Sequence, residues 1–272
     1  MRSETYKTPG PVRLDLEFPM GRIEIETVEG DETHVELQAS GDRSVRELEE
    51  NARIESFRRG ERDEVVVEVN MRSGFWISFD RPDVRLRVTC PPGAELDIRT
   101  KSADVEARGA YSSVDAKTAS GDIYVQEASG DVSVKSASGD VRVETVGGRL
   151  EMNSASGDLK VDSVAGEANV QLVSGDLYIR EAGDSVRANT VSGDQRLETV
   201  SRGRMELRAI SGDIGVGIRR GSRLYVDANT LSGSTSSDVE LADAPQQEGD
   251  GETPLVELFA KTVSGDVRIE RS

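Results

Sequence analysis

Large and reactive side chains are both scarce in this chain. Five Phe, five Tyr and one Trp make up 4% of the 272 residues, which suits a narrow core. The single cysteine, Cys90, excludes an internal disulfide and a cysteine-based metal site. No stretch approaches the ~18 apolar residues that cross a bilayer, so we expect no membrane insertion.

Positive charge is also in short supply. Lys and Arg number 34 against 51 Asp and Glu, and the net charge of −17 argues against binding to nucleic acid or to anionic lipid. The first residues, MRSETYKTPGPVRLDLEF, lack the apolar centre of a signal peptide. The compartment stays open, because a targeting segment could lie outside this sequence.

Catalytic motifs are absent as well. The one histidine, His34, falls in a strand-like stretch, and Cys90 is followed by prolines without a histidine nearby. Neither a G-x-S-x-G nor an H-E-x-x-H motif occurs. We therefore expect no enzyme activity and no organic cofactor.

A repeat of nine residues dominates the rest of the chain. Its glycines fall nine apart from Gly121 to Gly175, as in SGDIYVQEA SGDVSVKSA SGDVRVETV. Counting from the turn Asp, the second and fourth positions are apolar and the third is polar, as in a half-buried strand. The seventh position is small or β-branched, whereas strict alternation would place the next inward-facing residue at an even position. The alternation therefore shifts by one residue after the fourth position, and the chain must bend there.

Two folds could use this repeat. An antiparallel meander would need roughly twenty strands in one sheet, whereas open sheets rarely exceed ~10. A solenoid stacks each turn of chain ~4.8 Å from the last and builds its core from columns of Val, Ile and Leu. Full Ser-Gly-Asp turns alternate with looser ones. We therefore predict an all-β, parallel β-solenoid (β-helix or β-roll) in which two half-coils of about nine residues make one coil.

The regularity of the repeat also predicts the domain organisation. We expect residues 1–10 to be a flexible tail. Residues 11–95 should form an irregular β region that contains one short helix, near 42–54, and caps the first coil. Residues 96–272 should form the solenoid. The acidic segment 238–254 is expected to be a mobile loop. The stretch TVSGDVRI at 262–269 is expected to be the closing strand.

The turn aspartates are the first candidate site. Six recur once per coil and should line one edge: Asp122, Asp140, Asp158, Asp176, Asp194 and Asp213. Carboxylates stacked ~5 Å apart repel by roughly 1 kcal/mol or more, so something must offset the repulsion. Turn amides that donate to each carboxylate would do so, and so would bridging Ca²⁺. The calcium β-roll motif needs further glycines and an Asp that are missing here.

Two other features could bind a partner. The segment SGFWISFD either plugs the core or forms an exposed recognition loop, and its large aromatic side chains are Phe75, Trp76 and Phe79. Outward third-position side chains should form flat, ribbed faces suited to weak multivalent contact with glycans or proteins; examples are Tyr124, Arg142, Lys160 and Tyr178.

The ladder of Ser-Gly-Asp-Val units, preceded by an apolar strand and by CPPGAEL at 90–96, resembles the bacterial putative-adhesin family over residues 12–271. That family is a domain of unknown function and is similar to the head domains of auto-transporter adhesins. The resemblance implies a β-solenoid at the cell envelope or outside the cell, and it carries over no catalytic residue.

Together these features predict a non-enzymatic structural or adhesin-like module that presents its ribbed faces for weak multivalent binding at the cell envelope. A surface glycan or a protein would be the partner. One alternative is a Ca²⁺-binding module that uses the Asp ladder, and another is a cytoplasmic self-assembling scaffold that resembles bactofilins. The sequence leaves the ligand and the oligomeric state open.

Overall fold

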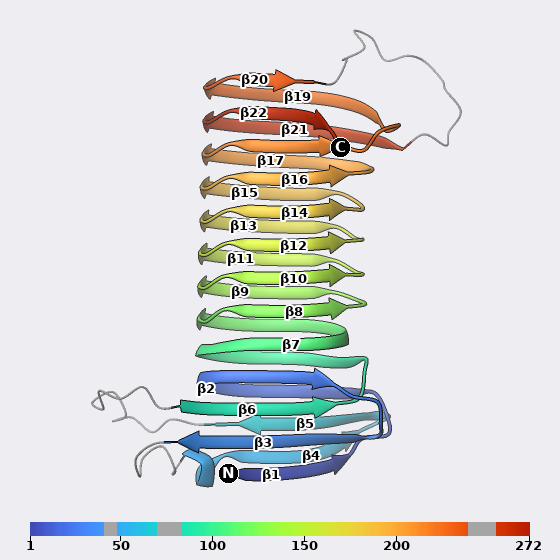
Figure 1. Cartoon of the computed structure of the whole chain (residues 1–272), viewed down its shortest axis with the longest axis vertical. Coiled ribbons are helices and arrows are strands. Elements are labelled where there is room, and N and C mark those ends of the chain that lie inside the picture. Colours follow the sequence, from blue (N-terminus) through green and yellow to red (C-terminus); the bar gives the residue numbers. More distant parts are fainter. Residues whose placement is uncertain (41–47, 70–82, 239–253) are drawn as a thin grey trace, which may run out of the picture. The chain divides into compact units, whose positions relative to one another are not determined.

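The computed structural model describes residues 1–40, 48–69, 83–238 and 254–272 (Figure 1). The chain divides into two compact units, Met1–Asp140 and Val141–Ser272, and each has its own stacked strands. Residues 239–253, the greater part of the predicted mobile loop, lie outside the described residues.

The N-terminal unit is built on two long strands, β2 (Val12–Thr27) and β7 (Ala94–Ser120). They run parallel in register, and β2 also pairs in parallel with β5 (Arg62–Glu68) and β6 (Asp83–Cys90). Strands β8 (Ile123–Ala128) and β9 (Val132–Ser138) pair in parallel with β7. The predicted boundary at residues 95–96 thus falls inside a continuous strand.

The expectation of a flexible N-terminal tail is wrong for residues 2–7. They form β1 (Arg2–Lys7), which pairs antiparallel with β3 (Glu32–Ser40), because their alternating side chains match that strand in register. Strand β3 in turn pairs antiparallel with β6. The Tyr6 hydroxyl donates to the Ile54 carbonyl at 3.0 Å and fixes β1 further.

The helix predicted near residues 42–54 ends earlier than expected, at Asn51. Residues 48–51 are helical, and residues 42–47 lie outside the described part of the chain. Strand β4 (Arg53–Arg59) begins almost at once and pairs antiparallel with β5. Ile54 is therefore a buried strand residue rather than part of the helix stripe.

The C-terminal unit is a parallel solenoid whose coils each contain two strands. One column of strands, in spatial order, is β10 (Val141–Val146), β12 (Leu159–Val164), β14 (Leu177–Ala182), β16 (Gln195–Val200), β18 (Ile214–Ile218), β22 (Val267–Arg271) and β20 (Thr235–Ser237). The other is β11 (Leu150–Ser156), β13 (Ala168–Ser174), β15 (Val186–Ser192), β17 (Gly203–Ser211), β21 (Leu255–Ser264) and β19 (Arg223–Ser232).

The register confirms the predicted coil. Val141 pairs with Leu159, which pairs with Leu177, so successive partners are eighteen residues apart and run parallel. A meander would have paired each strand antiparallel with the next one in sequence. The all-β parallel solenoid is therefore the fold of this unit.

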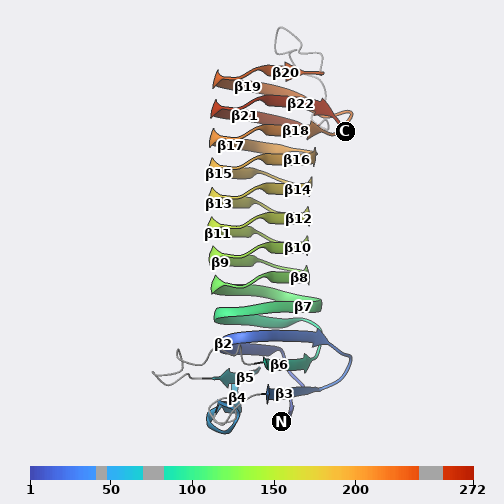
Figure 2. The ribbon, with the colours of Figure 1, turned by 60° about the vertical axis from the view of Figure 1, so that its left-hand side comes forward.

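The last coil in sequence is not the last coil in space. Strands β21 and β22 lie between the coil of β17 and β18 and the coil of β19 and β20, which is the outermost of this unit (Figures 1 and 2). The prediction that residues 262–269 close the stack is wrong. The repeat specifies which residues align but not which coil follows which, so two coils can exchange places.

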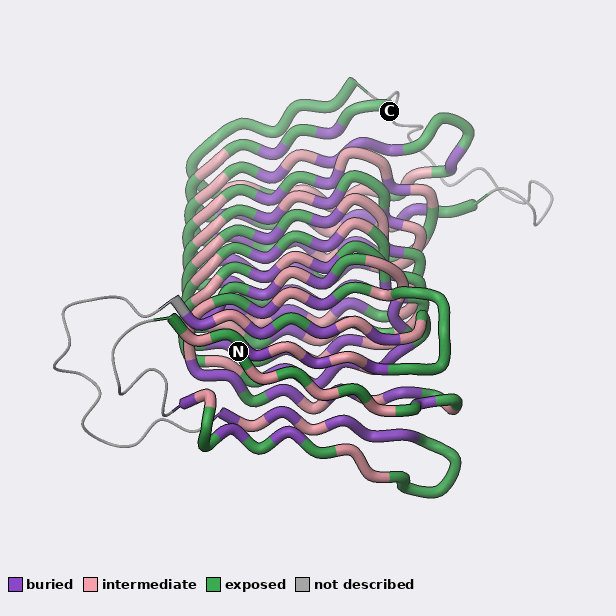
Figure 3. The backbone as a smooth tube through the Cα atoms, turned by 60° about the horizontal axis from the view of Figure 1, so that its bottom comes forward, coloured by how far each residue is buried: buried purple, intermediate pink, exposed green. Residues whose placement is uncertain are grey.

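The core follows the predicted alternation, and buried and exposed residues alternate along the strands (Figure 3). The predicted phase slip, however, occurs in only one half-coil of each pair. In β12 the burial pattern slips, so that Val164 is buried. In β13 the alternation continues, so that Leu172 is buried and Val173 is 52% exposed. The two half-coils therefore end in two different corners.

Candidate functional site

In the C-terminal unit, each turn aspartate accepts a hydrogen bond from the backbone of the next coil. The Asp176 amide donates to Asp158 Oδ1 at 2.8 Å, and the Asp194 amide donates to Asp176 Oδ1 at 2.8 Å. The amides of Asp213 and Asp266 continue the series, each at 2.8 Å. The column therefore links coil to coil through side chain and main chain.

The N-terminal unit contains the same arrangement. The Asp122 amide donates to Asp104 Oδ1 at 3.1 Å, and the Asp140 amide donates to Asp122 Oδ1 at 2.9 Å. All six predicted turn aspartates thus belong to such columns. Asp104 in β7 is a further member of the column. It was not predicted, because the repeat around it is less regular.

These contacts show how the stacked carboxylates are accommodated. A charge-assisted bond from a backbone N–H to each carboxylate offsets the repulsion between neighbours. The donor belongs to the next coil rather than to the same turn, which the sequence could not reveal. Among the described residues, no group of three His, Cys, Asp or Glu side chains is placed to share an ion. Bridging by Ca²⁺ stays a prediction.

Ser234 stands at the aspartate position of the outermost coil. Its amide and its hydroxyl both donate to Asp266 Oδ1, at 2.8 and 3.0 Å, and they lower the pKa of that carboxyl. Nothing stacks beyond this coil among the described residues that would need an acceptor. The change from Ser-Gly-Asp to Ser-Gly-Ser at 232–234 is therefore a sequence signal for the end of the stack.

Among the described residues, the other sequence candidates do not converge on a site. Phe75, Trp76 and Phe79 lie outside the described residues. His34 lies on β3, where Thr5 Oγ1 and Glu36 Oε1 are 2.8 and 3.0 Å from its ring nitrogens. Cys90 is buried, and burial raises the pKa of its thiol to about 12.

One outer face of the C-terminal unit carries a column of long polar side chains. The third positions of β10, β12 and β14 are in register and hold Arg142, Lys160 and Tyr178. Lys160 Nζ lies 5.3 Å from the centre of the Tyr178 ring, a cation–π contact. The Tyr178 hydroxyl hydrogen-bonds to Glu198, and burial, followed by that carboxylate, raises its pKa. The column is therefore a connected surface.

The opposite face carries the exposed Tyr225 and the half-buried Phe259. Glu206 accepts ion pairs from Arg187 at 3.1 Å and from Arg204 at 2.7 Å, and the bond from Arg187 is the main cause of its lowered pKa. The Arg204 guanidinium lies 4.3 Å from the Phe259 ring centre, and Tyr225 lies 5.8 Å from Phe259. These contacts join four adjacent strands.

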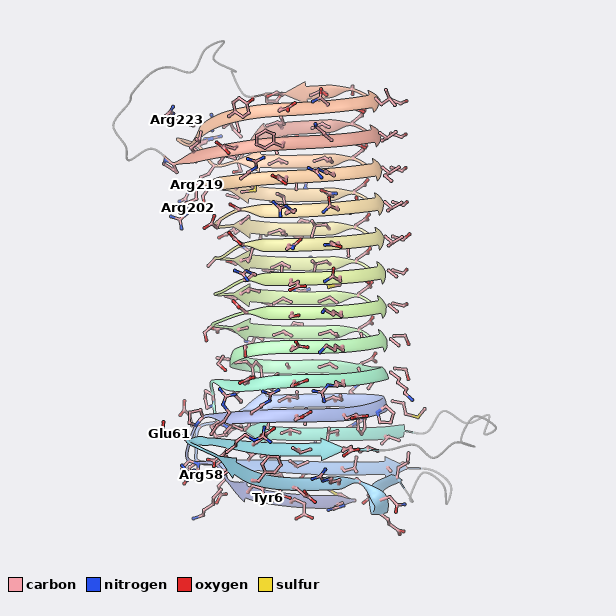
Figure 4. All side chains as sticks on the ribbon, turned by 180° about the vertical axis from the view of Figure 1, so that it is seen from behind. Tyr6, Arg58, Glu61, Arg202, Arg219 and Arg223 are labelled. Carbon is pink, nitrogen blue, oxygen red and sulfur yellow. The ribbon has the colours of Figure 1, made fainter. Side chains whose placement is uncertain are left out.

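A basic corner lies at the end of the coils away from the Ser-Gly-Asp turns. Figure 4 shows Arg202, Arg219 and Arg223 together there, and all three are exposed. Arg202 Nε donates to the Gly183 carbonyl at 3.0 Å. This corner is a local exception in a chain of net charge −17.

An all-β chain of stacked parallel coils with polar outer faces is a β-solenoid module. The chain belongs to the Toastrack DUF4097 family, whose model matches residues 13–270. This family is a domain of unknown function, and its match is consistent with the resemblance to adhesin-like proteins. The further likeness to auto-transporter adhesin heads stays a prediction. No curated protein matches the chain.

Several solved structures are similar over nearly their whole length. An adhesin-like protein from Bacteroides fragilis, described as a putative adhesin, has a TM-score of 0.48 at 14% identity and covers 98% of this chain and 96% of its own. A protein from Parabacteroides distasonis described as a putative lipid binding protein has a TM-score of 0.43 at 16% identity, with the same coverage of 98% and 96%. A putative cell adhesion protein from Clostridium sporogenes has a TM-score of 0.29 at 10% identity and covers 100% and 99%.

Proposed function

We propose that this chain is a non-enzymatic binding module that engages a surface glycan or protein weakly and at several coils at once. The observation that carries the proposal is the register of the outer faces. Side chains at the same position of successive coils lie one above the other, ~4.8 Å apart. A partner that repeats along its length can then make the same contact several times.

The types of residue on these faces support binding to polar partners. Arg142, Lys160, Tyr178 and Arg196 follow one another on adjacent strands of one column. Such side chains donate hydrogen bonds to hydroxyl and carbonyl oxygens and cover apolar patches with their stems. Each contact is small, so affinity would come from several contacts made together.

Binding rather than catalysis fits the reactive groups that the structure describes. The turn aspartates repeat in every coil and each accepts a neighbouring amide, which is a structural use of the carboxylate. The Cys90 thiol is buried and its pKa is raised to about 12, so it is a poor nucleophile near neutral pH. His34 is paired in register with Thr89, the neighbour of Cys90, but its ring contacts Thr5 and Glu36 rather than the thiol.

The cell envelope is the proposed setting, on the strength of the resemblance to adhesin-like proteins. Within the described residues, we find no helix whose length and apolar character would let it pass through a bilayer.

Comparing the binding strength of the single chain with that of a tetramer of the chain tests this proposal. The chain would be displayed singly and as a streptavidin tetramer on an array of bacterial and host glycans and on immobilised envelope proteins. We expect the tetramer to bind at least tenfold more tightly than the monomer. No binding by either form, or equal binding by both, would contradict the proposal.

Two variants would locate the binding face. Arg142→Ser with Lys160→Ser changes two paired outward positions on one face, and Gln171→Ser with Asn189→Ser changes two paired outward positions on the other. We expect one pair to weaken binding of the tetramer and the other to leave it unchanged. Unchanged binding by both pairs would show that the faces are not the binding surface.

A further inference from the structure

One position interrupts the ribbed face of β16, β18 and β22. Gly215 on β18 is in register with Arg196 on β16 and with Arg268 on β22. The same column carries Lys160 and Tyr178 in earlier coils. A long side chain is therefore missing at this coil, with arginines on both sides of the gap; the column otherwise shortens only at Ser236, in the outermost coil of this unit.

Packing does not require the glycine at this position. A Cβ added to Gly215 would have one neighbour, Arg196 Cγ at 3.9 Å, which is ordinary contact. Gly217 differs, because its Cβ would lie 1.9 Å from the Glu198 carbonyl oxygen. Glycine within a strand is unfavourable and often marks a place where a ligand approaches the backbone. Because packing does not explain why position 215 is a glycine, we take a role in ligand binding as the explanation.

Strand β16, beside the gap, is irregular close to Arg196, the residue that is paired with Gly215. The register of β16 and β18 shifts between Leu197 and Val200, which is the mark of a β-bulge. Bulges bend a strand and re-aim its side chains, and they are frequent beside functional sites. The bulge includes Glu198, whose carboxylate accepts the Tyr178 hydroxyl. The wall of the gap is thus held in place from the coil below.

A groove of about 440 Å³ occupies this place. Gly215 and Gly217 lie at its base, Arg196 and Glu198 form one wall, and Arg268 and Glu270 form the other. The Arg268 guanidinium lies 3.8 Å from Glu270, so that wall presents a donor and an acceptor side by side. The volume falls within the range of ~300–1,000 Å³ that is usual for small-ligand sites.

We propose that this groove binds one neutral pyranose ring of a glycan chain. This inference rests on the proposed function and assigns it a site. Sugar hydroxyls both donate and accept, so they can bridge a carboxylate and a guanidinium, while the ring lies on glycine backbone and arginine stems. Carboxylates outnumber guanidinium groups in the lining, which disfavours sulfated and uronic-acid sugars.

Filling the groove tests the assignment. Gly215→Gln places a long, uncharged side chain where the neighbouring coils have long side chains, and a Cβ at this position meets only ordinary contact. We expect the melting temperature to stay the same or rise and binding of neutral sugar to fall at least tenfold. Ser133→Gln, at an outward position of β9, is the matched control and should change neither.

The probes are neutral trisaccharides of glucose, galactose, mannose and N-acetylglucosamine, with sulfated and uronic-acid trisaccharides as the contrasting set. Saturation-transfer NMR would detect the bound sugar, and titration would give its affinity. Binding of a neutral sugar that Gly215→Gln abolishes supports the inference. Equal binding by wild type and Gly215→Gln, a preference for the anionic set, or no binding would overturn it. The proposed function would survive if the tetramer still bound envelope glycans or proteins elsewhere.

Discussion

At the scale of single residues, the turn aspartates act as connectors between coils. Each Oδ1 accepts the amide of the next aspartate in the stack, as in the bond from Asp194 to Asp176 at 2.8 Å. That role explains why the outermost coil can carry Ser234 instead of an aspartate. The aspartate column was predictable from the repeat, whereas the partner of each carboxylate depends on stacking and was not.

The turn glycines need both their backbone conformation and their lack of a side chain. Gly175 has a φ of +129°, and a Cβ there would lie 2.2 Å from the Gly157 carbonyl oxygen. We expect Gly175→Ala to lower the free energy of unfolding by about 3 kcal/mol or more, from strain and clash together.

Gly221→Ala is the matched control for this substitution. Gly221 has a φ of +89° but no atom within 4 Å of the added Cβ. Strain alone should cost about 1 kcal/mol. Denaturant unfolding of both variants measures the difference, and equal losses would show that close approach of the coils is not what requires Gly175.

The carboxyl of Asp266 provides a test of the outermost coil. Hydrogen bonds from the Ser234 amide and hydroxyl lower its pKa below the ordinary Asp value. A lowered pKa means that the contact stabilises the fold above the unfolded value of ~3.9 and is lost as the pH falls through the folded value. We expect NMR titration to give a lower pKa for Asp266 in wild type than in Ser234→Ala. Identical values would contradict the contact.

At the scale of the strand, the two half-coils of each coil have different geometries. The predicted phase slip is present in β12 and absent from β13, because the chain leaves them through different corners. The sequence alternates full and loose turns, which was enough to predict a two-strand coil. It did not show whether the seventh residue of a half-coil faces the core or the solvent, because Val and Ala suit both environments.

Two valines at this seventh position test the difference. Val164 on β12 is 1% exposed, and Val173 on β13 is 52% exposed. Val164→Ala should destabilise the fold by about 2 kcal/mol through the cavity that it leaves. Val173→Ala should change stability by less than about 0.5 kcal/mol. Similar losses in thermal or denaturant unfolding would mean that both half-coils bend in the same way.

At the scale of the whole molecule, the repeat determined the fold class but not the order of the coils. Any eighteen-residue coil presents nearly the same edge, so the sequence could not show that β21 and β22 insert below β19 and β20. The non-repetitive β1 was missed for the opposite reason: its residues pair with a strand distant in sequence, β3. The groove at Gly215 was not predicted, because a glycine in one repeat cannot be distinguished from ordinary sequence variation until its neighbours in space are known.

Parallel stacking of the coils is the claim on which the columns, the faces and the groove all depend. Spin labels on Lys160→Cys and Tyr178→Cys test it directly, because these positions are in register on adjacent strands, ~4.8 Å apart. Cys90 can stay in place, since it is buried and its thiol pKa is about 12. The doubly labelled chain should give a strongly spin-coupled EPR spectrum, and a pair at Lys160 and Asn169 should not. A 160/178 spectrum equal to the sum of the single labels would contradict the stacked solenoid.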